Sequence, residues 1–336
     1  MNQVSYDTKV NKGNFHIFLI ADEVHWLGAE KSRRGLIEEY DFRLGLSATP
    51  KRWFDDLGTQ IMYDYFGDVV FEFSLKDAIT KINPVTGYTY LTFYRYIPYF
   101  VSLTDDELDE YFEKTKSIAQ RYSKANDDEK DNILESLLFR RADIIKNASK
   151  KYSVLEHILD KLGRDVKHTI IYCTPQQIDN VMEIVNQRGL MAHRFTMEEG
   201  TTPNEKYNGL SEREYILQKF AEGEYQVLVA MKCLDEGVDV PPAKIAILMA
   251  SSGNPREYIQ RIGRVIRRYP NKSEATIYDI IVAPSLNRKL PPELKNLEKK
   301  IFEKELKRYE EIAQIAVNNA EAMEMIYKIK NVGGAI

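Results

Sequence analysis

Two adjacent carboxylates, Asp22 and Glu23, follow an apolar run near the start of the chain, in the stretch FHIFLIADEVHWLG at residues 15–28. Burying an unpaired carboxylate is costly, so such a pair should lie at an exposed strand end or hold something positive. Two interpretations are open at this point. The first is a strand that ends in a solvated acidic turn. The second is a strand that delivers both carboxylates to a metal–nucleotide site.

A second group of residues suited to chemistry lies in NPREYIQRIGRVIRRYP, residues 254–270. If this segment is helical, Gln260, Arg264 and Arg267 fall at i, i+4 and i+7 and share one polar face. Clustered cations repel each other, so we expect either solvent or an anion beside them. The alternatives are a solvated basic face and a polyphosphate site, since arginine forks bind phosphate oxygens and stabilise charge that develops during phosphoryl transfer.

The apolar pattern of the first hundred residues predicts the elements that position the two carboxylates. Residues 15–21 form a near-continuous apolar run, which is typical of a buried parallel strand. Residues 42–46, FRLGL, favour a second short strand, followed by the turn SATP. Residues 69–73 suggest a third strand that leads into a short helix at 75–81.

From residue 168 onward, predicted strands and helices alternate. The predicted strands are 168–173, 225–231, 244–250 and 275–282, and the predicted helices are 175–189, 210–224 and 254–270. Ser211 and Glu214 have the spacing of a capping box at the start of one helix. This alternation predicts a parallel sheet with helices on both faces. Active groups in such folds lie at the carboxyl ends of the strands.

Two further regions are predicted to be helical. Residues 103–160 have helical periodicity, are highly charged and contain almost no Gly or Pro, so we expect a solvated helical connector. Thr104 and Glu107 form a second predicted capping box there. One long helix is predicted over about 293–330, with an interrupted apolar stripe. Packing on the core and binding of a partner are about equally consistent with that stripe.

Composition limits the class of protein. The 336 residues are 43% hydrophobic and carry a net charge of −4, which allows two or three domains but excludes a generally basic nucleic-acid binder. No apolar run approaches the roughly 18–20 residues of a membrane span, and the first residues are too polar for a secretory signal. Cys173 and Cys233 lie far apart with no histidine nearby in sequence, which favours reduced core cysteines in a cytosolic protein.

Five short motifs stand in order along the chain: ADEVH (21–25), SAT (47–49), IIYCTP (170–175), CLDEGVDVP (233–241) and QRIGRVIRR (260–268). They resemble motifs II to VI of superfamily 2 helicases, and most closely the DExH motors of the type III restriction subunit and XPB-like repair branch. The resemblance covers most of residues 15–283 and is specific, because each motif falls on a predicted strand end or helix.

The resemblance implies an ATP-dependent helicase or translocase, or a fragment of one. ATP and Mg²⁺ are the implied cofactors, and nucleic acid is the implied partner, with DNA favoured over RNA. Hydrolysis between two RecA-like lobes would drive movement along the nucleic acid, in repair, restriction or phage defence. Within the first lobe, Asp22 would hold Mg²⁺ and Glu23 would activate the attacking water. His25 would contact the second lobe, and Ser47 and Thr49 would couple hydrolysis to motion.

Roles in the second lobe follow from the same resemblance. The implied nucleotide-binding residues are Gly237, Asp239, Gln260, Arg264 and Arg267. Asp239 would bind the ribose, Gly237 would let the backbone approach closely, and the two arginines would act as fingers on the phosphates. The implied nucleic-acid residues are Thr174, Pro175 and Lys232. An exposed lysine is ordinarily a solubilising charge, and that interpretation is preferred for Lys232.

The chain departs from the family pattern in its first lobe. No G-x-x-x-x-G-K-[ST] sequence occurs in it, and 21 residues precede Asp22. We therefore expect residues 1–336 alone to be inactive, and we expect a rearranged first lobe, a missing lobe segment, a partner chain or a dimer to cover the open edge of the first strand. The expected domains are a partial RecA-like lobe (1–100), a helical connector (101–160), a complete RecA-like lobe (161–285) and a C-terminal helical tail (286–336).

Two other functional classes compete with the motor. One is a catalytically inactive module that binds nucleic acid or a partner and descends from a helicase. It is less favoured, because a pure binding module has no use for Glu23, Arg264 and Arg267. A nuclease is disfavoured, because the acidic pair at the end of the first strand is already explained by the helicase motif.

Overall fold

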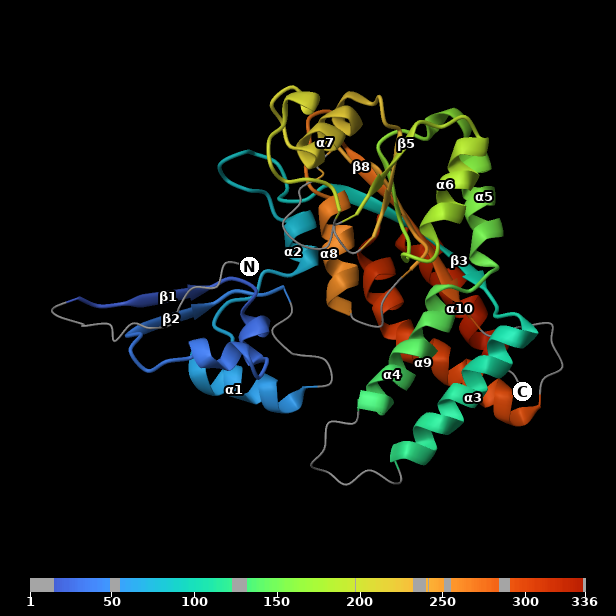
Figure 1. The fold of residues 1–336 in the computed structure, drawn as a ribbon, viewed down its shortest axis with the longest axis horizontal. Helices are drawn as coiled ribbons and strands as arrows, with labels where there is room; N and C mark the ends of the chain where they lie inside the picture. The colour runs from blue at the N-terminus through green and yellow to red at the C-terminus, as the bar shows by residue number, and fades with distance from the viewer. Residues whose placement is uncertain are drawn as a thin grey trace. The chain divides into compact units, whose positions relative to one another are not determined.

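The computed structural model describes residues 15–48, 55–122, 132–196, 198–231, 240, 242–250, 255–283 and 291–334. The chain divides into two compact units, residues 1–74 and residues 75–336. Figure 1 labels most of their helices and strands. Within the described ranges, no helix is both long enough and apolar enough to cross a membrane.

The first unit is built on a two-stranded parallel sheet. Strand β1 (Phe18–Ala21) pairs with β2 (Phe42–Gly45), as predicted from the two apolar runs. The short 3-10 helices η1 (Val24–Gly28) and η2 (Ser32–Gly35) lie between the two strands in sequence, and helix α1 (Asp56–Phe66) follows them. The carboxylate of Asp55 accepts a hydrogen bond from the amide of Gly58 and so caps the start of α1.

Two predictions for the first unit are wrong. Strand β1 was expected to be buried, yet Phe18 is 54% exposed and only Ala21 is buried. With β2 as its one partner among the described residues, the sheet is too narrow to enclose the apolar side chains of β1. Residues 69–73 do not form the expected strand, and Val70 is 90% exposed. An apolar pattern alone does not make a strand where no neighbouring strand pairs with it.

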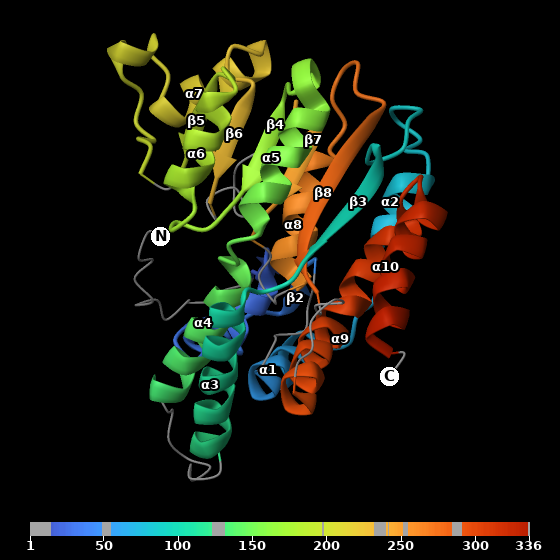
Figure 2. The ribbon, with the colours of Figure 1, turned by 90° about the vertical axis from the view of Figure 1, so that its right-hand side faces the viewer.

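The second unit is an α/β structure around a six-stranded parallel sheet with the order β3-β8-β7-β4-β6-β5. Figure 2 shows these strands side by side in that order. The strands are β3 (Phe93–Val101), β4 (Thr169–Tyr172), β5 (Ala192–Phe195), β6 (Val227–Ala230), β7 (Ile245–Leu248) and β8 (Glu274–Val282). Every residue of β4 and β6 is buried, as the continuous apolar runs predict. This is the sheet expected of a RecA-like lobe.

Hydrophobic clusters cover both faces of this sheet, because successive strand residues point to opposite sides. Ile170 and Tyr172 of β4 face one cluster and Ile171 faces the other. The first cluster includes side chains of helices α2 (Leu75–Thr80), α7 (Glu212–Glu222), α8 (Pro255–Val265), α9 (Pro292–Ile315) and α10 (Asn319–Gly334). The second includes side chains of α3 (Asp105–Tyr122), α5 (Lys151–Leu162) and α6 (Ile178–Gln187). The predicted helices therefore lie on both faces.

The structure corrects the boundary expected at residue 100. Strand β3 pairs with β8 along its whole length, so residues 75–100 belong to the second unit. The C-terminal tail also belongs to this unit, and it consists of two helices rather than one. The corner between α9 and α10 covers the outer edge of β3: the amide of Val317 donates to the carbonyl of Tyr94, and the Asn318 side chain bonds both backbone groups of Tyr96. A covered edge prevents pairing with another chain.

Helices α3 and α4 (Asn132–Lys146) run side by side and project beyond one end of the sheet (Figures 1 and 2). The predicted capping box at the start of α3 is present: the Thr104 amide donates to Glu107 at 2.8 Å, and the Glu107 amide donates to the Thr104 hydroxyl at 3.3 Å. Glu107 also accepts from the amide of Ser149 at 2.7 Å. Burial raises the pKa of Glu107, but these hydrogen bonds outweigh it and hold the pKa below its usual value.

Candidate functional site

The first unit places Asp22 and Glu23 in a turn at the carboxyl end of β1. The backbone of Glu23 is left-handed, with φ 50° and ψ 47°, and its amide donates to the carboxylate of Asp22 at 2.9 Å. This conformation is uncommon for residues other than Gly, and such strain concentrates at active sites and ligand clamps. The turn therefore presents two carboxylates in a conformation that the local sequence does not favour.

The predicted coupling residues meet this turn. The ring nitrogen Nδ1 of His25 lies 3.1 Å from the Ser47 hydroxyl and 3.3 Å from a carboxylate oxygen of Glu23. His25 is 3% exposed, so these contacts lie inside the first unit. The structure thus brings together Glu23, His25 and Ser47, whereas Thr49 lies outside the described residues.

Backbone hydrogen bonds join the two segments that carry these side chains. The amide of Val24 donates to the carbonyl of Leu46 at 2.9 Å, and the amide of Leu46 donates to the carbonyl of Ala21 at 2.8 Å. Gly45 permits this close approach, because a Cβ there would lie 2.9 Å from a methyl carbon of Val24. The acidic turn and the segment that carries Ser47 are therefore joined directly by backbone hydrogen bonds.

In the second unit, helix α8 ends earlier than predicted. Gln260 and Arg264 lie on α8, which ends at Val265, whereas Arg267 lies beyond it in an isolated antiparallel bridge with Leu91. The prediction that all three side chains share one helical face is therefore wrong for Arg267. The structure still keeps Arg267 within one turn of the helix that carries the other two.

A buried lysine ends α8 at this point. The Lys272 ammonium donates to the carbonyls of Val265 and Arg267, at 2.5 and 2.8 Å. Carbonyls in the last turn of a helix have no intrahelical partner, and a lysine side chain satisfies them. The amide of Thr92 donates to the carbonyl of Ile266 at 2.7 Å and fixes the chain direction after the helix.

We expect Lys272→Ala to lower the free energy of unfolding of the second unit by about 2–3 kcal/mol, because a buried ammonium loses hydrogen bonds to two carbonyls. Urea denaturation followed by circular dichroism measures this loss. Lys299→Ala is the matched control, since that side chain is 49% exposed, and it should change stability by no more than about 0.5 kcal/mol. Equal effects of the two changes would contradict the capping role.

Buried polar groups also fix α8 to the sheet. The carboxylate of Asp279 on β8 is fully buried and accepts from the hydroxyls of Tyr258 on α8, at 2.6 Å, and Tyr96 on β3, at 3.0 Å. Arg261 is buried, donates to the carbonyl of Ala250, and lies over the ring of Tyr172 at 5.2 Å. The local sequence pattern did not indicate these anchors. The available signal was a single acid, Asp279, inside the apolar run 275–282.

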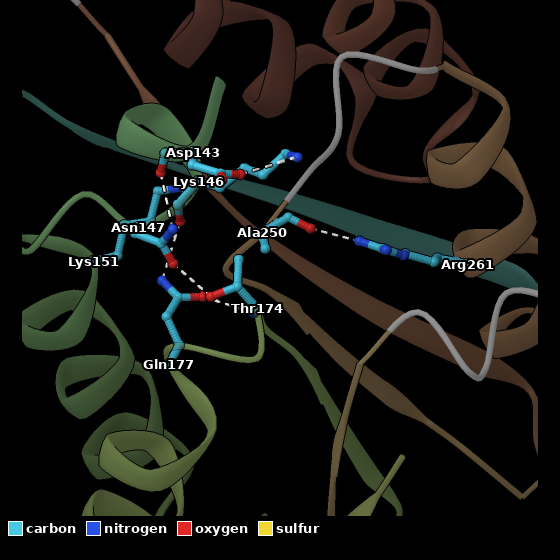
Figure 3. Close-up of polar contacts among 8 residues, drawn as sticks. All are labelled: Asp143, Lys146, Asn147, Lys151, Thr174, Gln177, Ala250 and Arg261. Atoms are coloured by element: carbon cyan, nitrogen blue, oxygen red, sulfur yellow. Dashed lines mark hydrogen bonds and ion pairs between the residues drawn. The ribbon is translucent and has the colours of Figure 1, made fainter. Parts of the chain in front are cut away.

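Polar side chains gather where β4 ends (Figure 3). The Thr174 hydroxyl donates to the side-chain oxygen of Asn147 at 2.5 Å, and the Thr174 amide donates to the side chain of Gln177 at 3.0 Å. The Gln177 amide group in turn donates to the carbonyl of Lys146 at 3.1 Å. These bonds hold residues 175–177 in a turn, which is why α6 begins at Ile178 rather than at the predicted residue 175.

A buried lysine extends this network to β7. The Lys151 ammonium donates to the carbonyl of Met249 at 2.6 Å and to the carbonyl of Lys146 at 3.2 Å. The corner between α4 and α5 is thereby tied to the carboxyl ends of two central strands. Of the predicted nucleic-acid residues, Thr174 is buried in this network and Pro175 is exposed beside it. Lys232, together with the predicted nucleotide-binding residues Gly237 and Asp239, lies outside the described residues.

The side chains of the acidic turn suit Mg²⁺. This ion prefers oxygen ligands and is usually bound through one or two carboxylates together with substrate phosphates and water. Asp22 and Glu23 supply two carboxylates in sequence. Within the described ranges, no group of three or more His, Cys, Asp or Glu side chains is arranged to hold a metal by itself. The donor set therefore fits a metal that is shared with a phosphate ligand.

Comparison with known proteins supports the resemblance to helicases. The family described as "Helicase conserved C-terminal domain" matches residues 150–269. A DNA 3'-5' translocase XPB2 from Sulfurisphaera tokodaii is 30% identical over 308 residues, which cover 85% of this chain and 64% of that protein. These matches support a superfamily 2 helicase-type protein. This finding confirms the resemblance that the five motifs indicated.

Other relatives of this helicase-type chain match with lower identity. A Halobacterium salinarum protein whose name includes the words "DNA 3'-5' helicase Rad25" is 25% identical over 280 residues, 78% of this chain and 38% of that protein. A pre-mRNA-splicing ATP-dependent RNA helicase PRP28 from Cryptococcus neoformans is 28% identical over 166 residues, 46% of this chain and 21% of that protein. The helicase-type chain thus spans between 21% and 64% of the length of these three relatives.

Proposed function

We propose that this chain supplies the acidic turn and the arginines of an ATP-driven motor that moves along DNA. The observation that carries the proposal is the left-handed turn at Asp22 and Glu23, in which Glu23 contacts His25. The same chain contains α8, the helix that bears Arg264, and a buried hydrogen bond from Tyr258 to Asp279 fixes this helix to the sheet. DNA is favoured because the relative that is 30% identical over 85% of the chain is named a DNA 3'-5' translocase.

In the proposed mechanism, Glu23 orients the attacking water and accepts its proton. Asp22 would bind the Mg²⁺ ion. When bound, Mg²⁺ neutralises charge on the phosphates. Arg264 and Arg267 stabilise the charge that develops on the transferred phosphoryl group, and Gln260 binds the phosphates. The contacts of His25 with Glu23 and Ser47 suit a residue that couples hydrolysis to movement.

Nucleotide binding in the second lobe is further assigned to Gly237 and Asp239, and coupling to Thr49, by the motifs they occupy. For the nucleic-acid track, the contacts of Thr174 support a narrower proposal. Because the Thr174 hydroxyl already donates to Asn147, Thr174 serves to hold the turn, and contact with the sugar-phosphate backbone falls to the exposed chain at Pro175. Lys232 is proposed to reach the same track.

Residues 1–336 by themselves are proposed not to hydrolyse ATP. The β- and γ-phosphates need a cradle of backbone N–H groups and a lysine, which the glycine-rich loop of such motors supplies. No such loop sequence occurs among these residues. Asp22 and Glu23 without it offer negative charge to a negative ligand. The uncovered apolar residues of β1 also suit a further lobe segment, a partner chain or a second copy.

We expect weak and salt-sensitive binding of single-stranded DNA by residues 1–336. Net charge is −4, and contact is limited to a few phosphates, so affinity should fall roughly tenfold between about 50 and 200 mM salt. Fluorescence anisotropy with a labelled oligodeoxynucleotide, repeated with the same sequence as RNA, measures the salt slope and the preference for DNA. Tight binding that does not respond to salt would contradict a track made of phosphate contacts.

A further inference from the structure

The loop between α2 and β3 is fixed against the end of α8. Ile82 and Thr89 form an antiparallel bridge across the loop, and Leu91 forms the bridge with Arg267. The amide of Leu91 also donates to the carbonyl of Ala78 in α2, at 2.9 Å. The loop is therefore attached by backbone hydrogen bonds both to α2 and to the segment that follows α8 and carries Arg267.

An aromatic ring at the tip of this loop is braced by an arginine. The guanidinium carbon of Arg268 lies 4.8 Å from the centroid of the Tyr88 ring, and the same guanidinium donates to the hydroxyl of Thr89 at 3.3 Å. Gly87, with φ 72°, allows the turn that brings Tyr88 to this position, and the amide of Asn83 donates to the carbonyl of Tyr88 at 2.7 Å. Even so, Tyr88 is 63% exposed.

We propose that Tyr88, braced by Arg268, is a stacking platform for the base of a nucleotide whose phosphates reach Arg267. The inference rests on the proposed function, because it takes Arg267 as a phosphate-binding residue. Every nucleobase has a π face, so an aromatic platform binds bases with little sequence preference. An arginine over one face of the ring holds it in place and adds a cation near the anionic part of the ligand.

The arrangement distinguishes this tyrosine from an ordinary exposed side chain. A solvated tyrosine at a loop tip needs neither a brace nor a fixed loop, whereas Tyr88 has both. Its neighbour in space, Arg268, follows Arg267 directly in sequence, and Leu91 of the same loop is bridged to Arg267. A ligand that carries both a base and phosphates suits this arrangement, because the base can stack on the Tyr88 ring and the phosphates can bind an arginine.

The same chemistry is offered by free ATP and by single-stranded nucleic acid. The bridge to Arg267 favours ATP, and titrations in two arms separate the sources. In one arm, a fluorescent N-methylanthraniloyl ATP analogue is titrated into residues 1–336. In the other, a labelled oligothymidylate is titrated. Each arm compares the wild type with Tyr88→Ala, Tyr88→Phe and the control Tyr327→Ala, a tyrosine on α10 that is 44% exposed.

Tyr88→Ala should weaken binding of the ATP analogue roughly 5- to 100-fold, since loss of one base stack has an effect of that order. Tyr88→Phe keeps the ring and should bind within about twofold of wild type, as should Tyr327→Ala. The same pattern in the oligothymidylate arm alone would assign the platform to nucleic acid. Wild-type affinity of Tyr88→Ala in both arms, or no binding by the wild type in either arm, would overturn the proposal.

One further variant separates this inference from the proposed function. If Arg267→Ala lowers hydrolysis by the completed motor while Tyr88→Ala does not weaken binding of the ATP analogue, the platform is wrong and the role proposed for Arg267 stands. If Tyr88→Ala weakens binding of the ATP analogue while Arg267→Ala leaves hydrolysis by the completed motor unchanged, the base is stacked as inferred and the role proposed for Arg267 is wrong.

Discussion

Arg267→Ala should lower the rate of ATP hydrolysis on the order of 10³- to 10⁵-fold in a motor in which this chain is completed by a phosphate-binding loop. The loss corresponds to roughly 4–7 kcal/mol of barrier. An arginine finger acts chiefly on charge that develops in the transition state, so kcat should fall while nucleotide affinity changes much less. The Arg267 backbone is held by Lys272 and by the bridge to Leu91, and therefore truncation of the side chain should leave the fold intact.

Steady-state hydrolysis and nucleotide binding, measured on the same preparations, test this expectation. Arg194→Ala is the matched control, because Arg194 is half exposed and paired with Asp179 at the surface of the second unit. It should hydrolyse ATP at the wild-type rate. Hydrolysis by Arg267→Ala within tenfold of wild type would remove Arg267 from the catalytic residues.

Asp279→Ala should lower the free energy of unfolding of the second unit by about 3–5 kcal/mol. The change removes the acceptor that the hydroxyls of Tyr96 and Tyr258 share inside the core. Burial raises the pKa of Tyr96 well above its usual value, so this hydroxyl stays protonated and continues to need an acceptor. The loss should be large because Tyr258 links α8 to the sheet.

Urea denaturation of Asp279→Ala beside Asp160→Ala tests this anchor. Asp160 pairs with Arg188 at the surface, and exposed pairs of this kind contribute at most about 1 kcal/mol. Tyr258→Phe and Tyr96→Phe each remove one hydroxyl and should each cost about half as much as the change at Asp279. Equal stability of Asp279→Ala and Asp160→Ala would show that the buried carboxylate does not anchor α8.

The second unit was largely predictable from sequence, because its central strands are continuous apolar runs and its helices have local end signals. The capping boxes at Thr104 and Ser211 are both present in the structure. Strands β3 and β5 were not predicted. The pairing of β3 depends on β8, which begins 173 residues after β3 ends, and β5 contains only four residues with two polar side chains. Local pattern carries no information about such partners.

The same limit applies to the site. Asp22, Glu23, His25 and Ser47 were found because they lie in short local motifs, and the structure brings Glu23, His25 and Ser47 into contact. The anchors were missed, because each acts across the fold. Lys272 ends α8 by donating hydrogen bonds to the carbonyls of Val265 and Arg267. The helical periodicity of residues 254–270 does not reveal this contact, so it did not predict that Arg267 lies outside the helix.

The end of the first unit was mispredicted for a related reason. Residues 69–73 have the composition of a strand, but strand formation depends on a neighbour that pairs with them. Conversely, β1 has the pattern of a buried strand and pairs as expected, yet its faces are exposed in the first unit. Burial depends on what packs against a strand, which its own residues do not specify.

The central claim is that this chain contributes Glu23 and the arginines to a motor whose phosphate cradle comes from another segment. A magnesium-dependent ATPase assay tests it most directly. Residues 1–336 are measured alone, and again with a first-lobe segment that carries a phosphate-binding loop, each with and without single- and double-stranded DNA. We predict no turnover by residues 1–336 alone, and turnover by the completed motor that Glu23→Gln abolishes. Turnover by residues 1–336 alone that Glu23→Gln abolishes, or turnover by the completed motor that survives Glu23→Gln, would contradict the account.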